Sequence, residues 1–411
     1  MLSNTMNFEV ATALLPPVTA VLLFLYFSYK RNQFHDSLPN EPSAHLFPHA
    51  EEHQEPKRDL FYDYYCWVSR ASLFPLSMRI LLIGFSESLY NILYYRWQRR
   101  SKPEDCIRAL AAQHLERRQA EGKIKRPFAI VTGGNAGIGY EIARALLFAD
   151  YHVILACRSQ RLAQSAITRL QATTGSDKVE YMNLDLSLFA NVREFAGRVA
   201  ERLKAGGEID VLIHNAGIMN LPFGLTADGF DTQLQVNALA PHLLTQLLLP
   251  HLARSAHILF TTSAVIYATN HIDLSMFTDR ARHSGLGNYA AGKACTMVLT
   301  REWNRRLTYH PGAVHTNLFN NTPPFHLSLF SSLLTLVLLS PPEGAITALK
   351  LVLAELDTEH RGGKYWFNEL PRRTPSVSMG AGIRPEEVKQ DIVGEWLWRE
   401  AGRMCGLKEE E

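Results

Sequence analysis

The sequence predicts an α/β fold in which a doubly wound parallel sheet follows an N-terminal extension of about 100 residues. Two patterns predict it. Short apolar runs rich in β-branched residues alternate with segments of helical spacing. A glycine-rich turn joins the first of these runs to the first helix. At 411 residues the chain has room for one domain of about 250 residues plus appended parts.

The first strand and the first helix enclose the glycine-rich turn. Residues 128–131 predict a buried strand, residues 138–147 have an apolar helical face, and Gly133, Gly134, Gly137 and Gly139 stand in the turn between them. Glycines here let the backbone approach a pyrophosphate, which the positive helix N-terminus attracts. A plain glycine turn is the alternative, because the usual spacing is Gly-x-Gly-x-x-Gly. The predicted dinucleotide contacts are Gly133, Asn135, Gly137, Ile138 and Gly139.

The end of the second strand indicates which dinucleotide binds. Residues 151–157 predict this strand, and a carboxylate after it would bind a ribose 2′-hydroxyl. Cys157, Arg158 and Ser159 offer no carboxylate. Arg158 suits a 2′-phosphate through charge-assisted hydrogen bonds, so the sequence favours NADP(H) over NAD(H). The alternative is an ordinary surface arginine.

Tyr289 and Lys293 form the predicted acid/base pair. An unperturbed tyrosine has a pKa of about 10 and is a poor base near neutrality. A lysine four residues along lies on the same helix face, and its charge is expected to lower the tyrosine pKa. Tyr289 then suits proton exchange with an alcohol or ketone oxygen. A solvated helix carrying both residues is the alternative, but the glycine turn about 150 residues earlier favours hydride transfer with a nicotinamide cofactor.

These motifs resemble the short-chain dehydrogenase/reductase family, with its Rossmann fold, over residues 126–368. Residues 216–219 and 225–230 are similar to the retinol dehydrogenase-like branch, and residues 340–345 and 362–368 support that likeness. The remaining motifs of the family, in chain order, are Asp185, Asn215-Ala216-Gly217, Asn237, Ser263 and Pro311-Gly312.

The resemblance implies a role for each of these residues. On the catalytic side, Ser263 orients the reacting oxygen, Asn237 holds a water of a proton relay, and Lys293 also holds the nicotinamide ribose. On the cofactor side, Asn215 and Ala216 close over the adenine half.

Two further cofactor contacts are implied by the resemblance. Asp185 meets the adenine ring, and the alternative for it is a helix N-cap. Pro311 and Gly312 begin a segment that closes over the nicotinamide.

One spacing departs from the family. Seventeen residues separate Lys293 from Pro311, where relatives have roughly thirty. If the helix continues through Arg306, residues 307–310 are all that remains for a strand and its entry turn, and a strand needs about five or six residues. The sequence therefore predicts that the sixth strand is missing and that residues 311–318 do not reach the cofactor. An incomplete gene product and a shortened helix are the two explanations left open.

The N-terminal part predicts a membrane anchor. Residues 10–29 are apolar and just long enough to span a bilayer, and a cleaved signal peptide is the alternative. Residues 73–95 predict either a second span, with Arg79 and Glu87 as costly charges, or a helix lying in the membrane interface. From Arg96 to Arg126 there are ten Lys/Arg and four Asp/Glu, which favours a cytoplasmic location.

Composition excludes some classes of protein. The net charge of +2 indicates no nucleic-acid partner. The five cysteines are scattered without metal-binding spacing and indicate free thiols in a reducing compartment. The expected domains are a membrane anchor and linker (1–105), a basic helical linker (106–125), an NADP-binding domain (126–370) and a C-terminal helical tail (371–411).

The expected function is that of an oxidoreductase at the membrane of the endoplasmic reticulum or a lipid droplet, with a cytoplasmic catalytic domain. It would transfer a hydride between NADP(H) and a lipophilic alcohol or carbonyl, polyprenol-like first and retinoid- or sterol-like second. A cofactor-binding or interaction protein that has lost turnover together with its sixth strand is the alternative.

Overall fold

The computed structural model of the chain divides into two compact units, Met1–Trp67 and Val68–Glu411. The sheet and the helices around it belong to the larger unit. The structure describes residues 65, 68, 75–92, 101–123, 125–204, 206–269, 271–272, 274–302, 307–321, 338–354, 364–367, 370–372, 378–379 and 390–407.

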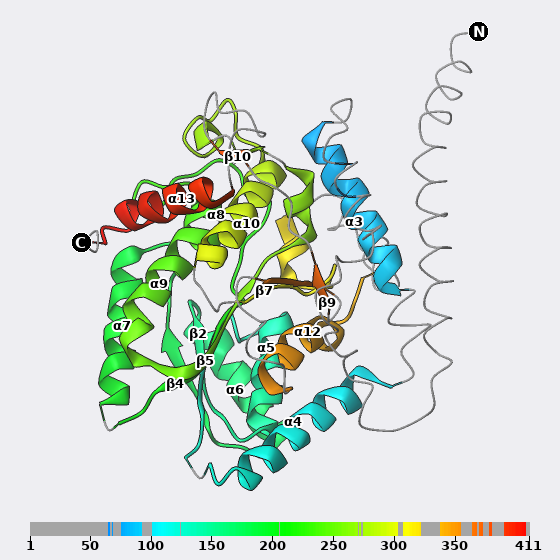
Figure 1. Ribbon diagram of the computed structural model, residues 1–411, viewed down its shortest axis with the longest axis vertical. Helices are drawn as coiled ribbons and strands as arrows, with labels where there is room; N and C mark the ends of the chain where they lie inside the picture. Colours follow the sequence, from blue (N-terminus) through cyan, green and yellow to red (C-terminus); the bar gives the residue numbers. More distant parts are fainter. Residues whose placement is uncertain are drawn as a thin grey trace. The chain divides into compact units, whose positions relative to one another are not determined.

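An eight-stranded sheet of order β3-β2-β1-β4-β5-β7-β8-β9 forms the centre of the fold (Figure 1), and only its β8–β9 pair is antiparallel. All five residues of β1 are buried, since the strand lies inside the sheet and is covered on both faces. Strand order reverses between β1 and β4, and the carboxyl ends of strands at such a point form a ligand crevice. The strands are β1 (Phe128–Thr132), β2 (His152–Cys157), β3 (Val179–Asn183), β4 (Ile209–His214), β5 (Leu252–Thr261), β7 (Leu307–His310), β8 (Lys364–Phe367) and β9 (Leu370–Arg372).

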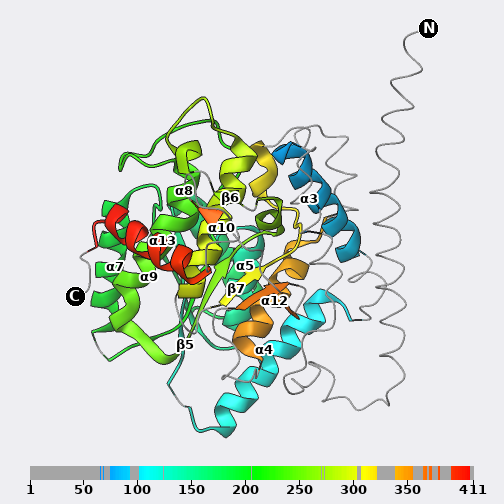
Figure 2. The ribbon, with the colours of Figure 1, turned by 45° about the horizontal axis from the view of Figure 1, so that its top comes forward.

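Helices cover both faces of the sheet, as Figures 1 and 2 show. One layer contains α5 (Gly137–Phe148), α6 (Gln160–Thr174) and α12 (Pro341–Leu353). The opposite layer contains α7 (Phe189–Leu203), α9 (Ala240–Leu248) and α10 (Gly285–Glu302). This arrangement confirms the predicted doubly wound parallel sheet.

The sixth strand of the parallel sheet is present, so the prediction that it is missing is wrong. Helix α10 is described as Gly285–Glu302, and β7 begins at Leu307. β7 pairs in parallel with β5 on one side and β8 on the other. The main-chain N–H of Thr262 also donates to the carbonyl of Tyr309 at 2.9 Å. Residues 307–310, which the prediction judged too few for a strand and its entry turn, form the strand themselves.

The first predicted membrane segment, residues 10–29, lies outside the described residues. The second forms helix α3 (Leu76–Ile92), which packs against α10 and against the 3-10 helix η4 (Ala264–Ala268). Ile80, Ile83 and Glu87 are buried on α3. A buried carboxylate such as Glu87 is tolerated in this apolar helix only when it has a partner. No helix in the described part of the chain is both long and apolar enough to cross a membrane.

The basic segment before the sheet takes part in the fold. Helix α4 (Pro103–Ala120) packs against α5 and α12. Arg144 of α5 is buried and binds Glu104 of α4 through two bonds of 2.5 and 2.6 Å. Arg117 Nη2 donates to the Leu353 carbonyl at 2.5 Å, so a cation meets the negative C-terminus of α12.

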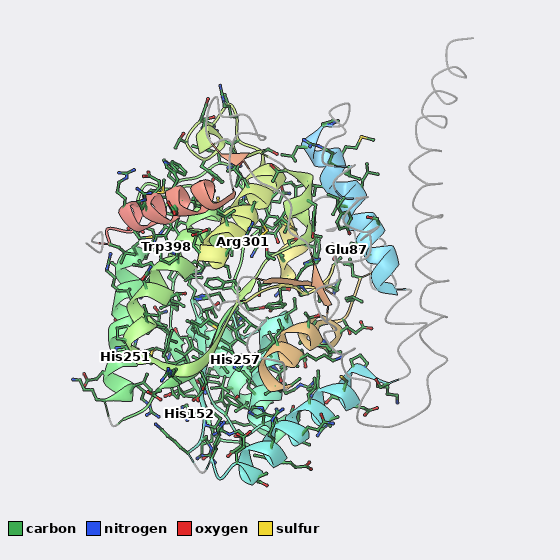
Figure 3. All side chains as sticks on the ribbon, in the orientation of Figure 1. Glu87, His152, His251, His257, Arg301 and Trp398 are labelled. Atoms are coloured by element: carbon green, nitrogen blue, oxygen red, sulfur yellow. The ribbon has the colours of Figure 1, made fainter. Side chains whose placement is uncertain are left out.

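The C-terminal segment forms helix α13 (Gln390–Met404), which packs against α10. Trp398, labelled in Figure 3, meets the ring of His242 of α9 edge-on, with 4.7 Å between ring centroids. The Cys405 thiol donates to the carbonyl of Leu239 at 3.4 Å. The tail is therefore held on the α9–α10 layer by aromatic and main-chain contacts.

A separate two-stranded pair joins β6 (His271–Ile272) to β10 (Ser378–Met379).

Candidate active site

The turn after β1 has no space for side chains. Gly133 and Gly137 have φ of +66° and +57°, in the left-handed region that glycine tolerates best. A Cβ added to Gly139 would lie 2.4 Å from Asn215 Nδ2 and 2.6 Å from the Gly133 carbonyl oxygen. Helix α5 begins at Gly137, so its positive N-terminus opens onto this turn. The result is a cradle made of backbone, which suits a phosphate.

Thr132 and Asn215 connect this turn to the end of β4. Thr132 Oγ1 accepts hydrogen bonds from the main-chain N–H groups of Asn215 and Ala216, each at 3.0 Å. Asn215 Nδ2 donates in return to the Thr132 carbonyl at 3.0 Å. Asn135 lies in the same turn, and the backbone of Gly133, Gly134 and Asn135 faces the buried Cys157 thiol at the end of β2. The predicted residues Asn215 and Ala216 therefore lie beside the glycines.

Tyr289 and Lys293 lie one turn apart on α10, and both are buried. The Tyr289 hydroxyl is hydrogen-bonded to Ser263, which follows β5 and caps η4. Lys293 Nζ lies 5.9 Å from the centroid of the Tyr289 ring and donates to the Thr261 carbonyl at 2.8 Å. The structure thus brings three of the predicted catalytic residues together at the carboxyl end of β5.

Asn237 completes this group from the neighbouring helix. It lies in a π-helical turn (Gln235–Leu239), a feature that occurs often at functional sites. Its amide group exchanges two hydrogen bonds of 2.9 Å with the backbone of Ile218. A Cβ on Gly217 would lie 3.2 Å from Asn237 Oδ1 and 3.5 Å from Lys293 Nζ, so both side chains flank Gly217. Thr296 Oγ1 donates to the Asn237 carbonyl at 2.9 Å.

The segment after β7 returns to the glycine turn, so the prediction that it does not reach is wrong. Gly312 has φ of +87°, and the chain turns there. A Cβ on Gly137 would lie 3.1 Å from Thr316 Cγ2. A Cβ on Gly344 would lie 2.5 Å from Val314 and 3.3 Å from Ile138. Pro311 and Gly312 therefore begin a segment that lies against the cradle.

Comparison with known proteins assigns this arrangement to a family. The sequence profile described as short chain dehydrogenase matches residues 127–324. Retinol dehydrogenase 13 of Homo sapiens is 32% identical over 294 residues, which cover 68% of this chain and 84% of that protein. The chain belongs to the short-chain dehydrogenase family.

Further relatives place the chain within that family. Polyprenol dehydrogenase of Danio rerio is 31% identical over 304 residues, covering 68% of this chain and 87% of that protein. A crystal structure of an uncharacterized protein from Mycobacterium Paratuberculosis superimposes with a TM-score of 0.50 and 26% identity, covering 69% of this chain and 95% of that one. These findings confirm a short-chain dehydrogenase of the retinol dehydrogenase-like branch.

Burial decides the ionisation of the acid/base pair in this short-chain dehydrogenase. Burial raises the pKa of Tyr289 to about 12, and the hydrogen bond with Ser263 counteracts only part of that rise. Burial lowers the pKa of Lys293 to about 8. The direction is opposite to the lowering expected from Lys293, because burial outweighs the other influences on the pKa of Tyr289; the Lys293 ammonium group donates to the Thr261 carbonyl. Tyr289 therefore retains its proton at neutral pH, the form that donates to a carbonyl oxygen.

Arg158 lies at the exposed end of β2, immediately before α6. Ser159 caps that helix by accepting from the N–H of Leu162 at 3.4 Å, which leaves the arginine at the helix N-terminus. Arg161, the second residue of α6, is also exposed, so a second cation lies three residues after Arg158.

Asp185 lies two residues beyond β3, and its carboxylate is engaged locally. Its Oδ1 accepts from the N–H and the hydroxyl of Ser187, at 2.9 and 2.6 Å. The N-cap of α7 is Leu188, so the N-cap alternative for Asp185 is wrong. Its carboxylate is half-buried among these bonds, and its contact with an adenine ring stays a prediction.

Proposed function

We propose that this short-chain dehydrogenase uses NADP(H) to interconvert a lipophilic alcohol and its carbonyl, with Tyr289 as the proton-exchanging residue. The observation that carries the proposal is the buried Tyr289 hydroxyl hydrogen-bonded to Ser263, with Lys293 one helical turn away. Family membership makes the chain an oxidoreductase related to retinol and polyprenol dehydrogenases. The cofactor, the substrate and the membrane location are the finer parts of the proposal.

The residues around the glycine turn fit a dinucleotide. Added Cβ atoms at Gly133, Gly137 and Gly139 would fall within 3.2 Å of neighbouring atoms, which is the shape of a cradle kept free of side chains. When bound there, NADP(H) supplies the hydride. Arg158 and Arg161 are exposed at the start of α6, and we assign them to the 2′-phosphate.

The catalytic residues then divide the work on the substrate oxygen. Tyr289 donates a proton to the carbonyl oxygen in reduction and accepts it in oxidation. Ser263 orients that oxygen through the same hydrogen-bonding network as Tyr289. Lys293 and Asn237 flank Gly217, where they position the ribose and lead the proton toward solvent.

A lipophilic substrate is supported by the relatives retinol dehydrogenase 13 and polyprenol dehydrogenase. We place a polyprenol-like alcohol or aldehyde first and a retinoid- or sterol-like one second. The apolar residues 10–29 support attachment to the endoplasmic reticulum or a lipid droplet with the catalytic unit in the cytoplasm. The full-length protein should stay with membranes through a carbonate wash, and its recovery in the supernatant would contradict the anchor.

The competing view, a cofactor-binding protein without turnover, rested on a missing sixth strand. That strand is present between β5 and β8, and the segment after it lies against the glycine turn. The argument for an inactive product therefore loses its structural basis.

The experiment that tests the proposal measures NADPH and NADH oxidation by the full-length protein in detergent micelles. A long-chain polyprenal, retinal and a sterol ketone serve as substrates. We expect turnover with NADPH, fastest with the polyprenal, and its loss in Tyr289→Phe. Equal rates in wild type and Tyr289→Phe would refute the assignment.

A further inference from the structure

Glu87 and His310 form a buried pair beside the catalytic tyrosine. His310 Nε2 lies 2.6 Å from Glu87 Oε1, and the two side chains are 3% and 4% exposed. Glu87 belongs to α3 and His310 is the last residue of β7, so the pair joins the N-terminal extension to the catalytic unit. Figure 3 shows Glu87 on the side of α3 that faces β7.

Helix α3 also packs against both elements that hold the reacting groups. It contacts η4, which begins one residue after Ser263. A Cβ on Gly287, two residues before Tyr289, would lie 3.1 Å from Leu76 Cδ2. The helix therefore lies over Ser263 and over the start of α10 at the same time.

The charge of Glu87 acts on Tyr289. Burial contributes most to the raised pKa of Tyr289, the Ser263 bond opposes it, and the negative charge of Glu87 raises it further. Arg79 is on the same helix as Glu87 but about 12 Å away along its axis, since it lies eight residues earlier. The other titratable or charged side chains on elements next to α3 are Tyr267 of η4, Tyr309 of β7, and Lys293, Cys295, Arg301 and Glu302 of α10.

The position of His310 gives the pair a second effect. β7 has only four residues, and Pro311 and Gly312 follow His310 directly. Holding His310 therefore holds the point from which the chain returns to the glycine turn.

We propose that Glu87 is a positioning residue of this active site: through His310 it anchors the end of β7, and with α3 packed on η4 and on the start of α10 it fixes the surroundings in which Tyr289 exchanges its proton. The N-terminal extension is then a structural part of the reaction centre as well as a tether. This inference rests on the proposed function, because it concerns the proton exchange of Tyr289.

The test compares full-length wild type with Glu87→Gln, His310→Gln and the double variant, and records kcat for alcohol oxidation against pH. Glu87→Gln removes the carboxylate. It should move the acidic limb of the kcat–pH profile, over which Tyr289 becomes able to act as a base, to lower pH by roughly 1 unit. Removing the imidazole should move the limb to higher pH, because the carboxylate loses the imidazole that lies 2.6 Å from it. The double variant should match Glu87→Gln, since the histidine acts through the carboxylate.

Ser88→Ala is the matched control, because the Ser88 hydroxyl donates only within α3, to the Gly84 carbonyl at 2.8 Å. It should leave the limb in place. NADPH affinity, followed by protein fluorescence, is the second measurement and should fall in His310→Gln. Glu87→Asp keeps a carboxylate and should restore part of the shift of the acidic limb that Glu87→Gln causes.

The outcomes separate the two proposals. A limb that stays in place in Glu87→Gln and His310→Gln, with only the melting temperature lowered, overturns the positioning role and leaves the proposed function intact. No turnover by wild type overturns the proposed function and this inference with it. If His310→Gln does not fold, the isosteric Glu87→Gln variant decides alone, by whether its limb moves.

Discussion

The two ends of the proposed site are built differently. The cofactor end is made of backbone: a Cβ on Gly139 would meet a main-chain oxygen at 2.6 Å, and Thr132 and Asn215 hold the turn with neutral hydrogen bonds. The catalytic end is made of buried ionisable side chains, among them Tyr289 and Lys293. Added volume should therefore damage the first end, and an added or removed charge should damage the second.

This difference follows from what each end has to do. A pyrophosphate is recognised by N–H groups and a helix N-terminus, which must come close to it. Proton exchange needs a group whose pKa suits the reaction, and burial is the means by which proteins shift a pKa furthest. Four predictions test whether the two ends respond separately.

The largest effect is expected at the catalytic end. Tyr289→Phe removes the proton donor and should lower kcat about 100- to 10,000-fold, the usual contribution of a general acid, while NADPH still binds. NADPH oxidation with a polyprenal measures this. Tyr309→Phe is the matched control, since it removes a buried hydroxyl that accepts from Thr261 at 2.8 Å. It should lower stability by about 1 kcal/mol with a far smaller loss of rate.

The next effect concerns volume at the cofactor end. Gly139→Ala should destabilise the protein by about 1–3 kcal/mol or more and weaken NADPH binding, because the new methyl group meets backbone. Gly197→Ala is the control: this glycine is exposed on α7 with nothing within 4 Å of an added Cβ. It should stabilise by roughly 0.5–1 kcal/mol. Urea unfolding of both variants decides, and equal effects would show that the turn is not tightly packed.

A charge change at the cofactor end should act on binding alone. Arg158→Ala should weaken NADPH binding by about 1.5–3 kcal/mol, the range for a hydrogen bond to a charged group, and leave NADH binding unchanged. Arg158→Lys should keep part of the affinity but lose bidentate contact. Titration of both cofactors measures this. If wild type binds NADPH and NADH equally, Arg158 has no role in cofactor choice.

The smallest effect concerns buried histidines away from the catalytic end. Burial lowers the pKa of His214 to about 3 and of His242 to about 4, from 6.5. As pH falls, the unfolded chain protonates these two histidines before the folded protein does. Their contribution to the free energy of unfolding is therefore complete above about pH 6.5 and is lost as pH falls toward 4.

The free energy of unfolding should therefore drop by about 1 kcal/mol per histidine between pH 6.5 and 5.5. His242→Phe should remove the part of this pH-dependent loss that comes from one histidine. His251→Asn, at a half-buried position, is the control. An identical slope in all three proteins would exclude His242 as a source of acid sensitivity.

Local patterns predicted the first strand, the glycine turn and the first helix well, because their determinants are contiguous. A strand, four glycines and a helix stand within about twenty residues, and each limits its neighbours. Tyr289 and Lys293 were predicted close together for the same reason, by helical spacing. Their ionisation was not predicted, since burial depends on what the rest of the chain places around them.

Long-range contacts account for what the sequence did not reveal. Residues 303–306, just before β7, contain no glycine or proline, so no local signal predicts that a strand begins at Leu307. β7 forms because β5 and β8 both offer hydrogen-bonding edges to it, and such tertiary context overrides local propensity. Glu87 and His310 are 223 residues apart, beyond the range of any periodicity.

The antiparallel strand β9 affects how these molecules behave when crowded. Within the described part of the sheet it is one of the two outer strands, and its central residue, Pro371, pairs with Trp366 of β8. Proline has no N–H to offer to a further strand, and natural sheets use it at their margins against self-association. The β9 margin is thus a poor template for aggregation through strand pairing.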